Sequence, residues 1–389
     1  MKKMLFSALL LGCIGCETAF AEGRVTGKTW LQRSEQLMKS VQTCFAHDDS
    51  GLLSEYYPDN RTQKATYLVS DDKGGKRYSY LWPFSGSVSA RAALFEAGKK
   101  AAGLRWLQHV TLPALDRYAD SLRQPSGYAS YLPTRPLADR FYDDNVWLGI
   151  DFADLYAVTG ATAWLHRAEE VWRFVLSGED ARTGGGIYWC EQKRQSKNTC
   201  SNAPATVMAL KLYQATGRRA YLEKGIALYE WTRRRLYDRK ERLYSDHVNL
   251  DGSIGRAKFA YNSGQMLQAA CLLYAATGEQ DYLLQADTLA QACGQRFFRR
   301  AENGALRVKF DHIWFEAVML RGYIEYGHHR DASEYIQGYA LELDELWRQH
   351  REPSGLLSER HRDGRRQRWL LAQTAYVEMM ARLATVATR

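Results

Sequence analysis

Along most of the chain, apolar residues recur with the helical spacing of i, i+3 and i+4, as in residues 164–176 and 221–236. Such spacing predicts helices that each bury one face. Strand-like alternation is confined to short stretches such as residues 186–189 and 243–245. The pattern therefore predicts an all-α protein.

One motif recurs three times within this pattern. Residues 155–160, 212–217 and 273–278 each read Leu-Tyr-x-x-Thr-Gly, and an aromatic-Leu pair begins four residues after each glycine. The three glycines are 57 and 61 residues apart, and weaker echoes end at Gly98 and Gly327. Each unit predicts a helix that ends at a left-handed glycine, a short turn and a second helix.

A period of about 60 residues accommodates two helices and two connections. Residues 22–389 then hold about six helix pairs, the first spanning about residues 30–102 and the last ending within residues 367–387. Six pairs predict a closed ring, an (α/α)6 toroid that forms a single domain over residues 22–389. An open superhelix of the TPR type would need shorter repeats and connections.

The N-terminus has the pattern of an export signal. Two lysines precede an apolar stretch at residues 5–14, which is too short to cross a bilayer, and Ala19-Phe20-Ala21 offers a cleavage site. The alternative is a lipoprotein signal that ends near Cys13 or Cys16, because residues 10–13 resemble a lipobox. Both alternatives place the protein in the periplasm, at the cell surface or outside the cell. They allow membrane contact only through an N-terminal lipid.

The composition narrows the classes of molecule that are expected as partners. The 24 Tyr and 11 Trp exceed what packing usually requires, and aromatic rings stack well on sugar faces. The net charge of +9 is concentrated in Arg-rich turns such as residues 233–235, without a basic stripe interleaved with aromatics, so we expect no nucleic-acid partner. An anionic glycan or cell surface stays open as a partner. We expect a monomer.

The cysteines and histidines predict neither a metal site nor a cofactor. The five cysteines beyond the predicted signal form no CxxC motif, and the chain has no histidine cluster. Cys190 and Cys200 bracket one loop. In an oxidising compartment they form either a disulfide or two unpaired thiols, and the sequence leaves both open.

Two adjacent aspartates, Asp143 and Asp144, stand at the start of an amphipathic segment that runs to Tyr156. Like charges repel, so folding alone does not favour this pair where a helix begins to bury its face. The alternative is a helix N-cap with a favourable dipole interaction. A pair of neighbouring carboxylates is also what acid/base-assisted cleavage of a glycosidic bond requires.

Polar and aromatic residues stand just before the repeated helices, where a toroid places its cleft. Amides, rings and acids of this kind can hold a neutral polyol, although any one Asn at a helix start is also a good N-cap. The predicted substrate contacts are Tyr142, Asn145, Trp189, Asn198, Asn202, Tyr261, Asn262, Gln265 and Asp311.

Four segments together, at residues 142–147, 185–189, 198–204 and 261–265, resemble glycoside hydrolase family 76, the endo-α-1,6-mannanases. The likeness runs over most of the mature chain and is most specific in order and spacing between about residues 140 and 270. It implies an (α/α)6 fold and metal-independent cleavage of α-1,6-linked mannan or manno-oligosaccharide with retention of configuration.

The resemblance also implies that Asp143 is the nucleophile and Asp144 the acid/base. Ser263 stands where some members have Gln or Thr, which leaves the subsites open. Adjacent Cα atoms are about 3.8 Å apart, so the two carboxyls can reach the roughly 5–5.5 Å separation of a retaining pair. The helix dipole favours an ionised Asp143, whose charge raises the pKa of Asp144.

Four other functions stay open. A sugar epimerase or an unsaturated glucuronyl hydrolase could use the same toroid, although an epimerase is expected to use His and the nine His are scattered. A non-hydrolytic glycan-binding protein gains nothing from the repulsion of two acids. A transglycosylase would use the same intermediate as the hydrolase.

Overall fold

The computed structural model describes residues 25–60, 64–68, 74–133, 137–358 and 367–387. The predicted signal at residues 1–21, with Cys13 and Cys16, lies outside the described residues.

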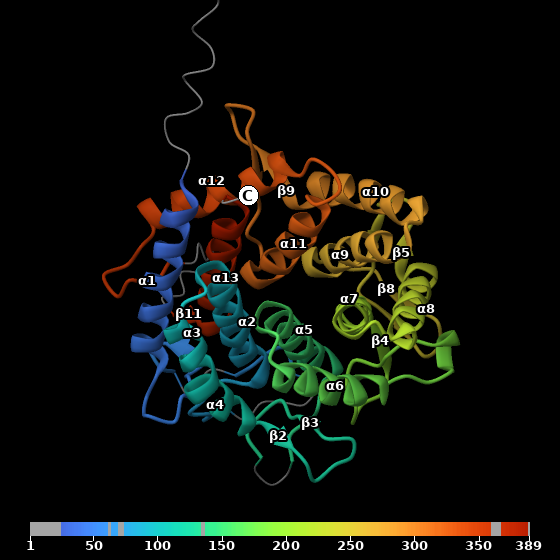
Figure 1. Ribbon diagram of the computed structural model, residues 1–389, viewed down its shortest axis with the longest axis horizontal. Coiled ribbons are helices and arrows are strands. Elements are labelled where there is room, and N and C mark those ends of the chain that lie inside the picture. Colours follow the sequence, from blue (N-terminus) through green and yellow to red (C-terminus); the bar gives the residue numbers. More distant parts are fainter. Residues whose placement is uncertain (1–24, 61–63, 69–73, 134–136, 359–366, 388–389) are drawn as a thin grey trace, which may run out of the picture.

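Within the described residues, six inner helices form a closed ring, and Figure 1 shows this ring inside a second one of outer helices. Each inner helix packs on the next, and the last packs on the first. The inner helices are α2 (Leu81–Gly98), α5 (Tyr142–Thr159), α7 (Thr199–Thr216), α9 (Ala260–Thr277), α11 (Ile313–Tyr326) and α13 (Leu370–Val386). The outer ones are α1 (Gly27–Phe45), α3 (Ala101–Trp106) with α4 (Leu112–Asp116), α6 (Thr162–Leu176), α8 (Arg219–Leu236), α10 (Gln280–Phe297) and α12 (Ser333–Gln349). The predicted (α/α)6 toroid is confirmed.

The two rings differ in how they bury their residues. The outer helix α1 has one apolar stripe, which includes Trp30, Leu37 and Val41. The inner helix α7 is buried at every position from Thr199 to Leu210. The predicted amphipathic pattern after Asp143 is therefore wrong for α5, because an inner helix has protein on all sides.

The repeated glycines end three inner helices as predicted. Gly160, Gly217 and Gly278 have φ of 69°, 69° and 74°, a left-handed conformation that glycine adopts without strain. The weaker echoes end differently. At the end of α2 the left-handed residue is Lys99, and Gly327 after α11 stays right-handed.

Short strands lie in the connections between helices. β4, β7 and β8 form a three-stranded antiparallel sheet, while β1–β11, β2–β3, β5–β6 and β9–β10 are two-stranded. The β1–β11 pair joins the first unit to the last, with Tyr56 opposite Trp369. The strands are β1 (Tyr56–Tyr57), β2 (Ala119–Asp120), β3 (Gly127–Tyr128), β4 (Ser196–Asn198), β5 (Tyr237–Asp238), β6 (Leu243–Tyr244), β7 (His247–Asn249), β8 (Ile254–Gly255), β9 (Phe298–Arg300), β10 (Leu306–Val308) and β11 (Arg368–Trp369).

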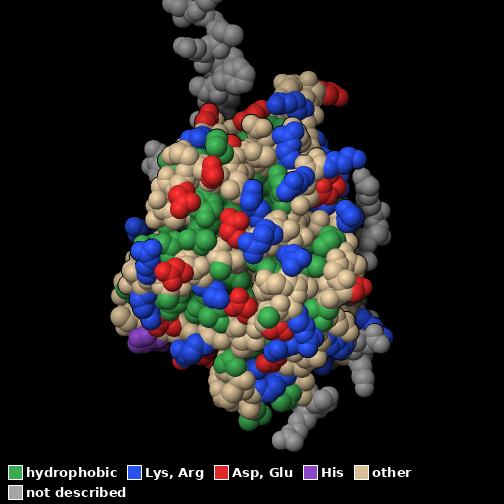
Figure 2. Space-filling model, turned by 90° about the vertical axis from the view of Figure 1, so that its right-hand side faces the viewer, with side chains coloured by type: hydrophobic (Ala, Val, Ile, Leu, Met, Phe, Trp, Pro, Cys, Tyr) green, Lys and Arg blue, Asp and Glu red, His purple; other side chains and the backbone are tan. Residues whose placement is uncertain are grey.

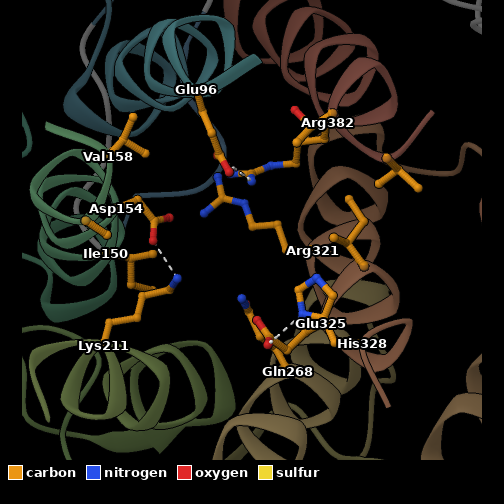
Figure 3. A pocket seen from close by; sticks show the side chains of 14 residues that line it. Glu96, Ile150, Asp154, Val158, Lys211, Gln268, Arg321, Glu325, His328 and Arg382 are labelled. Carbon is orange, nitrogen blue, oxygen red and sulfur yellow. Dashed lines mark hydrogen bonds and ion pairs between the residues drawn. The ribbon is translucent and has the colours of Figure 1, made fainter. Parts of the chain in front are cut away.

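A network of charged side chains, here called the polar hub, lies near the C-terminal ends of the inner helices around a cavity of about 150 Å³ (Figure 3). Lys211 Nζ donates to Asp154 at 2.5 Å, and Arg321 donates to both carboxylate oxygens of Glu378 at 2.7 and 2.9 Å. Arg382 Nε donates to Glu378 at 2.7 Å. The Lys211–Asp154 pair joins α7 to α5, and the Arg321–Glu378 pair joins α11 to α13, so these two pairs tie neighbouring inner helices together at this end, whereas the Arg382–Glu378 pair lies within α13.

The outer surface mixes both signs of charge. Figure 2 shows Lys and Arg side chains interspersed with acidic ones on one face of the molecule. The exposed Arg233 lies 3.8 Å from Glu230 of the same helix. None of the described helices is long and apolar enough to span a membrane.

Candidate active site

A cleft of about 500 Å³ opens at the end of the ring where the inner helices begin. Its walls come from the starts of α2, α5, α7, α9 and α11 and from the segments that precede the first four of these helices. The lining residues are Thr66, Tyr67, Leu68, Trp82, Phe141, Asp143, Asp144, Trp147, Trp189, Ser196, Asn198, Cys200, Asp246, His247, Phe259, Tyr261, Trp314 and Phe315.

Asp143 lies in the first turn of α5 and accepts three hydrogen bonds. Trp189 Nε1 donates to its Oδ2 at 2.9 Å, the Cys200 thiol donates to the same oxygen at 3.2 Å, and the Asp144 amide donates to Oδ1 at 3.0 Å. Burial raises the pKa of Asp143, and the donors from Cys200 and Trp189 oppose that rise. These donors and the helix N-terminus favour the ionised form.

Asp144 follows in the same turn. Its pKa is raised well above the ordinary value, first by burial and then by the charge of Asp143. None of the described residues that line the cleft is Lys or Arg, so no neighbouring cation opposes this rise. The pair therefore divides its protons unequally: Asp143 holds the negative charge, and Asp144 holds the proton.

An aromatic wall borders the cleft. The rings of Tyr261 and Phe315 stack at 4.1 Å and 17°, and Trp82 stacks on Phe315 at 6.3 Å and 24°. Trp314 packs edge-on against Trp147 at 5.0 Å. Flat apolar rings of this kind, next to a pair of acids, suit the faces of sugar rings.

Three predicted contacts lie beside the Asp pair in the cleft lining, namely Trp189, Asn198 and Tyr261. Trp189 binds Asp143 directly through its indole N–H. Asn198 accepts a hydrogen bond from Ser196 at 2.7 Å. All three come from segments that precede an inner helix or from its first turn, as the sequence pattern predicts.

Asn145 and Asn202 lie elsewhere, at equivalent buried positions of α5 and α7. Asn145 accepts from the Tyr128 amide at 2.7 Å and donates to the Tyr128 carbonyl at 2.9 Å. Asn202 makes the same pair of bonds to Ile187, at 2.7 and 2.9 Å. Both side chains are therefore fully used in fixing the backbone that precedes their helix, and neither lines the cleft. We name this arrangement the backbone clamp.

The clamp recurs in other units. Gln373 of α13 accepts from the Leu357 amide at 2.9 Å and donates to its carbonyl at 2.8 Å. In α9 the equivalent Ser263 accepts from the Tyr244 amide at 3.1 Å. In these units, a polar residue four positions after the N-cap thus holds the connecting backbone. This requirement explains why Asn145 and Asn202, which were predicted to contact substrate, stand where they do.

Tyr142 also points away from the cleft. It is fully buried, and its ring stacks on Phe174 at 4.9 Å. Arg194 donates to its hydroxyl at 3.4 Å. Tyr142 is therefore a core residue of the contact between α5 and α6.

Asn262 and Gln265 are buried and do not belong to the cleft lining, and Asp311 is exposed outside it. The Asn262 amide donates to Asp246 at 3.5 Å, so it contacts a lining residue from behind. Gln265 donates to Gln268 at 2.9 Å along α9.

Asp246 and His247 also line the cleft, and neither was predicted from the sequence. Asp246 Oδ2 lies 2.8 Å from His247 Nδ1, and this contact raises the pKa of His247. Asp246 lies between β6 and β7, directly after residues 243–245, which were predicted only to be strand-like, and His247 begins β7. The length of the connection before α9 was the available sequence signal that this segment could reach the cleft.

Cys190 and Cys200 are both free thiols in the structure, as are Cys44, Cys271 and Cys293. Cys190 is buried in the loop that pairs with Phe141, whereas Cys200 faces Asp143. Within the described residues, no group of three or more His, Cys, Asp or Glu side chains is placed to hold a metal ion.

The helical ring and its acid-bearing, aromatic-lined cleft define a carbohydrate-processing enzyme of the toroid class. Comparison with known proteins specifies the family. The sequence pattern described as "Glycosyl hydrolase family 76" matches residues 53–326. The chain belongs to this family and is a glycoside hydrolase. No curated protein sequence matches it.

Solved structures agree with this assignment. A family 76 glycoside hydrolase from a bovine Bacteroides thetaiotaomicron strain is 30% identical, with a TM-score of 0.81 over 92% of this chain and 78% of the other. A family 76 mannosidase from Bacteroides thetaiotaomicron is 29% identical, with a TM-score of 0.81 over 92% and 98%. An inactive variant of a Salegentibacter α-1,6-mannanase, with two adjacent aspartates replaced and α-1,6-mannotetrose bound, is 21% identical with a TM-score of 0.72 over 92% and 99%.

Proposed function

We propose that this protein is an exported, retaining endo-α-1,6-mannanase in which Asp143 is the nucleophile and Asp144 the general acid/base. The observation that carries the proposal is the adjacent pair itself. One carboxylate accepts three hydrogen bonds, the other is desolvated next to it, and no Lys or Arg is among the described lining residues.

The proposed reaction has two steps. The ionised Asp143 attacks the anomeric carbon, and the C–O bond to the leaving sugar breaks while Asp144 gives its proton to the departing oxygen. Asp144, now ionised, then takes a proton from water, and the resulting hydroxide equivalent displaces Asp143 from the sugar. The first step leaves a covalent glycosyl-enzyme, so the product keeps its starting configuration.

The substrate class is supported by the relatives. The Bacteroides thetaiotaomicron relative is described as a mannosidase, and the Salegentibacter protein was solved with α-1,6-mannotetrose. In that protein a variant with two adjacent aspartates replaced is described as inactive. The aromatic wall fits the apolar faces of a mannan chain. Export is supported by the N-terminal sequence pattern.

The test is incubation of the purified mature protein with linear α-1,6-mannan and size analysis of the products. A ladder of manno-oligosaccharides early in the reaction supports an endo-hydrolase. Mannose alone at early times contradicts endo action, and an unchanged polymer contradicts the proposal as a whole. With a manno-oligosaccharide as the only substrate, products longer than the starting material would indicate a transglycosylase.

A further inference from the structure

A thiol contacts the proposed nucleophile. Cys200 stands in the first turn of α7, and its sulfur lies 3.2 Å from Oδ2 of Asp143, the oxygen that also accepts from Trp189. The Tyr261 hydroxyl also hydrogen-bonds with the sulfur. The thiol is 3% exposed and is part of the cleft lining.

We infer that Cys200 is a positioning residue, a neutral thiol donor that fixes the Asp143 carboxylate and keeps it ionised for attack. This inference rests on the proposed role of Asp143. It assigns to Cys200 neither a nucleophilic nor a redox role.

The geometry sets the direction of the hydrogen bond. An ionised carboxylate only accepts, so the S–H group must be the donor. Burial and the nearby charges of Asp143 and Asp246 raise the pKa of the Cys200 thiol well above its ordinary value, so it keeps its proton over the working range of a glycosidase.

The contact also fixes the direction in which Asp143 points. Trp189 reaches Asp143 from the loop before α7, and Cys200 reaches it from α7 itself. Two donors from one unit therefore hold a carboxylate that belongs to the preceding unit. A weak donor such as S–H offsets part of the free-energy cost of burying the carboxylate charge. It does not stabilise the carboxylate so strongly that its nucleophilicity is lost.

The other titratable groups near this contact bear on any pH test. Asp144 lies beside Asp143 on α5, Cys190 lies in the loop before α7, Asp246 and His247 lie before α9, and Tyr261 lies on α9. Replacing Cys200 leaves all of these side chains in place. Tyr261 loses its hydrogen bond to the sulfur, but its pKa is raised well above its ordinary value of 10.0 and so lies far from the acidic limb. A shift in the Asp143 titration caused by the replacement therefore reports on the thiol.

The first experiment is the pH profile of kcat/KM on linear α-1,6-mannan for wild type, Cys200→Ala and Cys200→Ser. Loss of the donor in Cys200→Ala should move the acidic limb, which reports Asp143 ionisation, to higher pH by about half a unit to one unit. Cys200→Ser keeps a donor and should return the limb to the wild-type position or below it. A lower rate in Cys200→Ala with an unmoved limb would overturn the inference.

The second experiment does not need activity. The S–H stretching band, in an infrared region free of other protein absorption, is recorded for wild type, Asp143→Asn and Cys200→Ser, with Cys44→Ser as a control on α1. The Cys200 component, identified by its absence in Cys200→Ser, should move to higher frequency in Asp143→Asn, because an amide accepts less strongly than a carboxylate. A Cys200 band that is the same in both proteins would contradict the contact, whether or not the protein cleaves mannan. The two failures can therefore be distinguished.

Discussion

The carboxylates buried at the two ends of the ring have different neighbouring side chains. At the cleft, Asp143 and Asp144 are neighbours in the lining, and no Lys or Arg is among the described lining residues. At the polar hub, Glu378 is held by Arg321 and Arg382, and Asp154 is held by Lys211. Both groups of acids sit on the same inner helices or on equivalent ones, so the difference lies in the partners and not in the fold.

The arginine partners at the hub reverse the effect of burial on the carboxyl pKa. Burial acts to raise the pKa of Glu378, but Arg321 and Arg382 outweigh it and bring that pKa to about 2. At the cleft nothing outweighs it, and the pKa values of Asp143 and Asp144 both rise. Paired acids stabilise the ring at one end, whereas unpaired acids at the other end supply chemistry at a cost in stability.

The largest expected effect comes from removing either acid of the cleft. Asp143→Asn and Asp144→Asn should each lower kcat/KM on linear α-1,6-mannan by at least about a thousandfold, since members of a catalytic unit act together. Melting temperatures should stay the same or rise, because burial disfavours the ionised Asp143 and Asp144 takes up a proton on folding, and an amide has neither cost. Asp311→Asn, at an exposed site outside the cleft, is the matched control and should keep near-normal activity. Near-normal turnover in Asp143→Asn would refute the role assignment.

The hub should respond in the opposite way. Glu378→Gln leaves the buried Arg321 with Asp151, 3.9 Å away, as its one acidic partner among the residues that the structure describes. An uncompensated buried charge typically costs about 3–5 kcal/mol, so the free energy of unfolding in urea should fall by about that amount. At temperatures where the variant stays folded, kcat/KM should remain within about threefold of wild type. An unchanged unfolding midpoint would show that the hub does not stabilise the ring.

Asn202 and Asn198 separate the two kinds of asparagine at the start of α7. Asn202→Ala breaks the backbone clamp and leaves the Ile187 amide and carbonyl without partners. Its free energy of unfolding should fall by about 1–3 kcal/mol. Asn198→Ala, in the cleft lining, should mainly raise KM for manno-oligosaccharides. Calorimetry and steady-state kinetics on both variants test this distinction, and equal effects on stability would contradict it.

The smallest expected effects are those of pH on stability, and their signs differ between the two ends. Glu378 has a folded pKa of about 2 against an ordinary value of 4.5, so its contribution is complete above pH 4.5 and is lost as the pH falls toward 2. Asp143 and Asp144 have raised folded pKa values, so they lower the stability as the pH rises above 3.8. Urea titrations at several pH values should therefore find Asp144→Asn more stable than wild type at neutral pH. They should also find Glu378→Gln less sensitive than wild type to acid between pH 4.5 and 2. If the difference in free energy of unfolding between each variant and wild type stays constant across this pH range, the link between these pKa values and stability is contradicted.

The ring could be predicted from the sequence because its signals are local. A left-handed glycine followed four residues later by an aromatic-Leu pair marks the end of one helix and the start of the next, as at Gly160 and Gly217. The Asp pair was also visible, since two acids at a helix start need a reason beyond folding.

The rest depended on contacts that local sequence does not encode. Asn145 and Asn198 both stand near a helix start, yet one clamps backbone and the other lines the cleft, because only the fold decides which way each side chain points. Asp246 reaches the cleft through a hairpin, and the partners Arg321 and Glu378 are 57 residues apart. Neither arrangement has a spacing that singles it out.

The stereochemistry of the first product tests the central claim most directly. Linear α-1,6-mannan is hydrolysed inside the NMR tube, and the anomeric protons of the new reducing ends are followed from the first minutes. An unpaired Asp143 that attacks the sugar while Asp144 donates its proton predicts that the α-anomer appears first and the β-anomer grows later by mutarotation. Initial appearance of the β-anomer would mean direct attack by water, and it would contradict the assignment of Asp143 as a nucleophile.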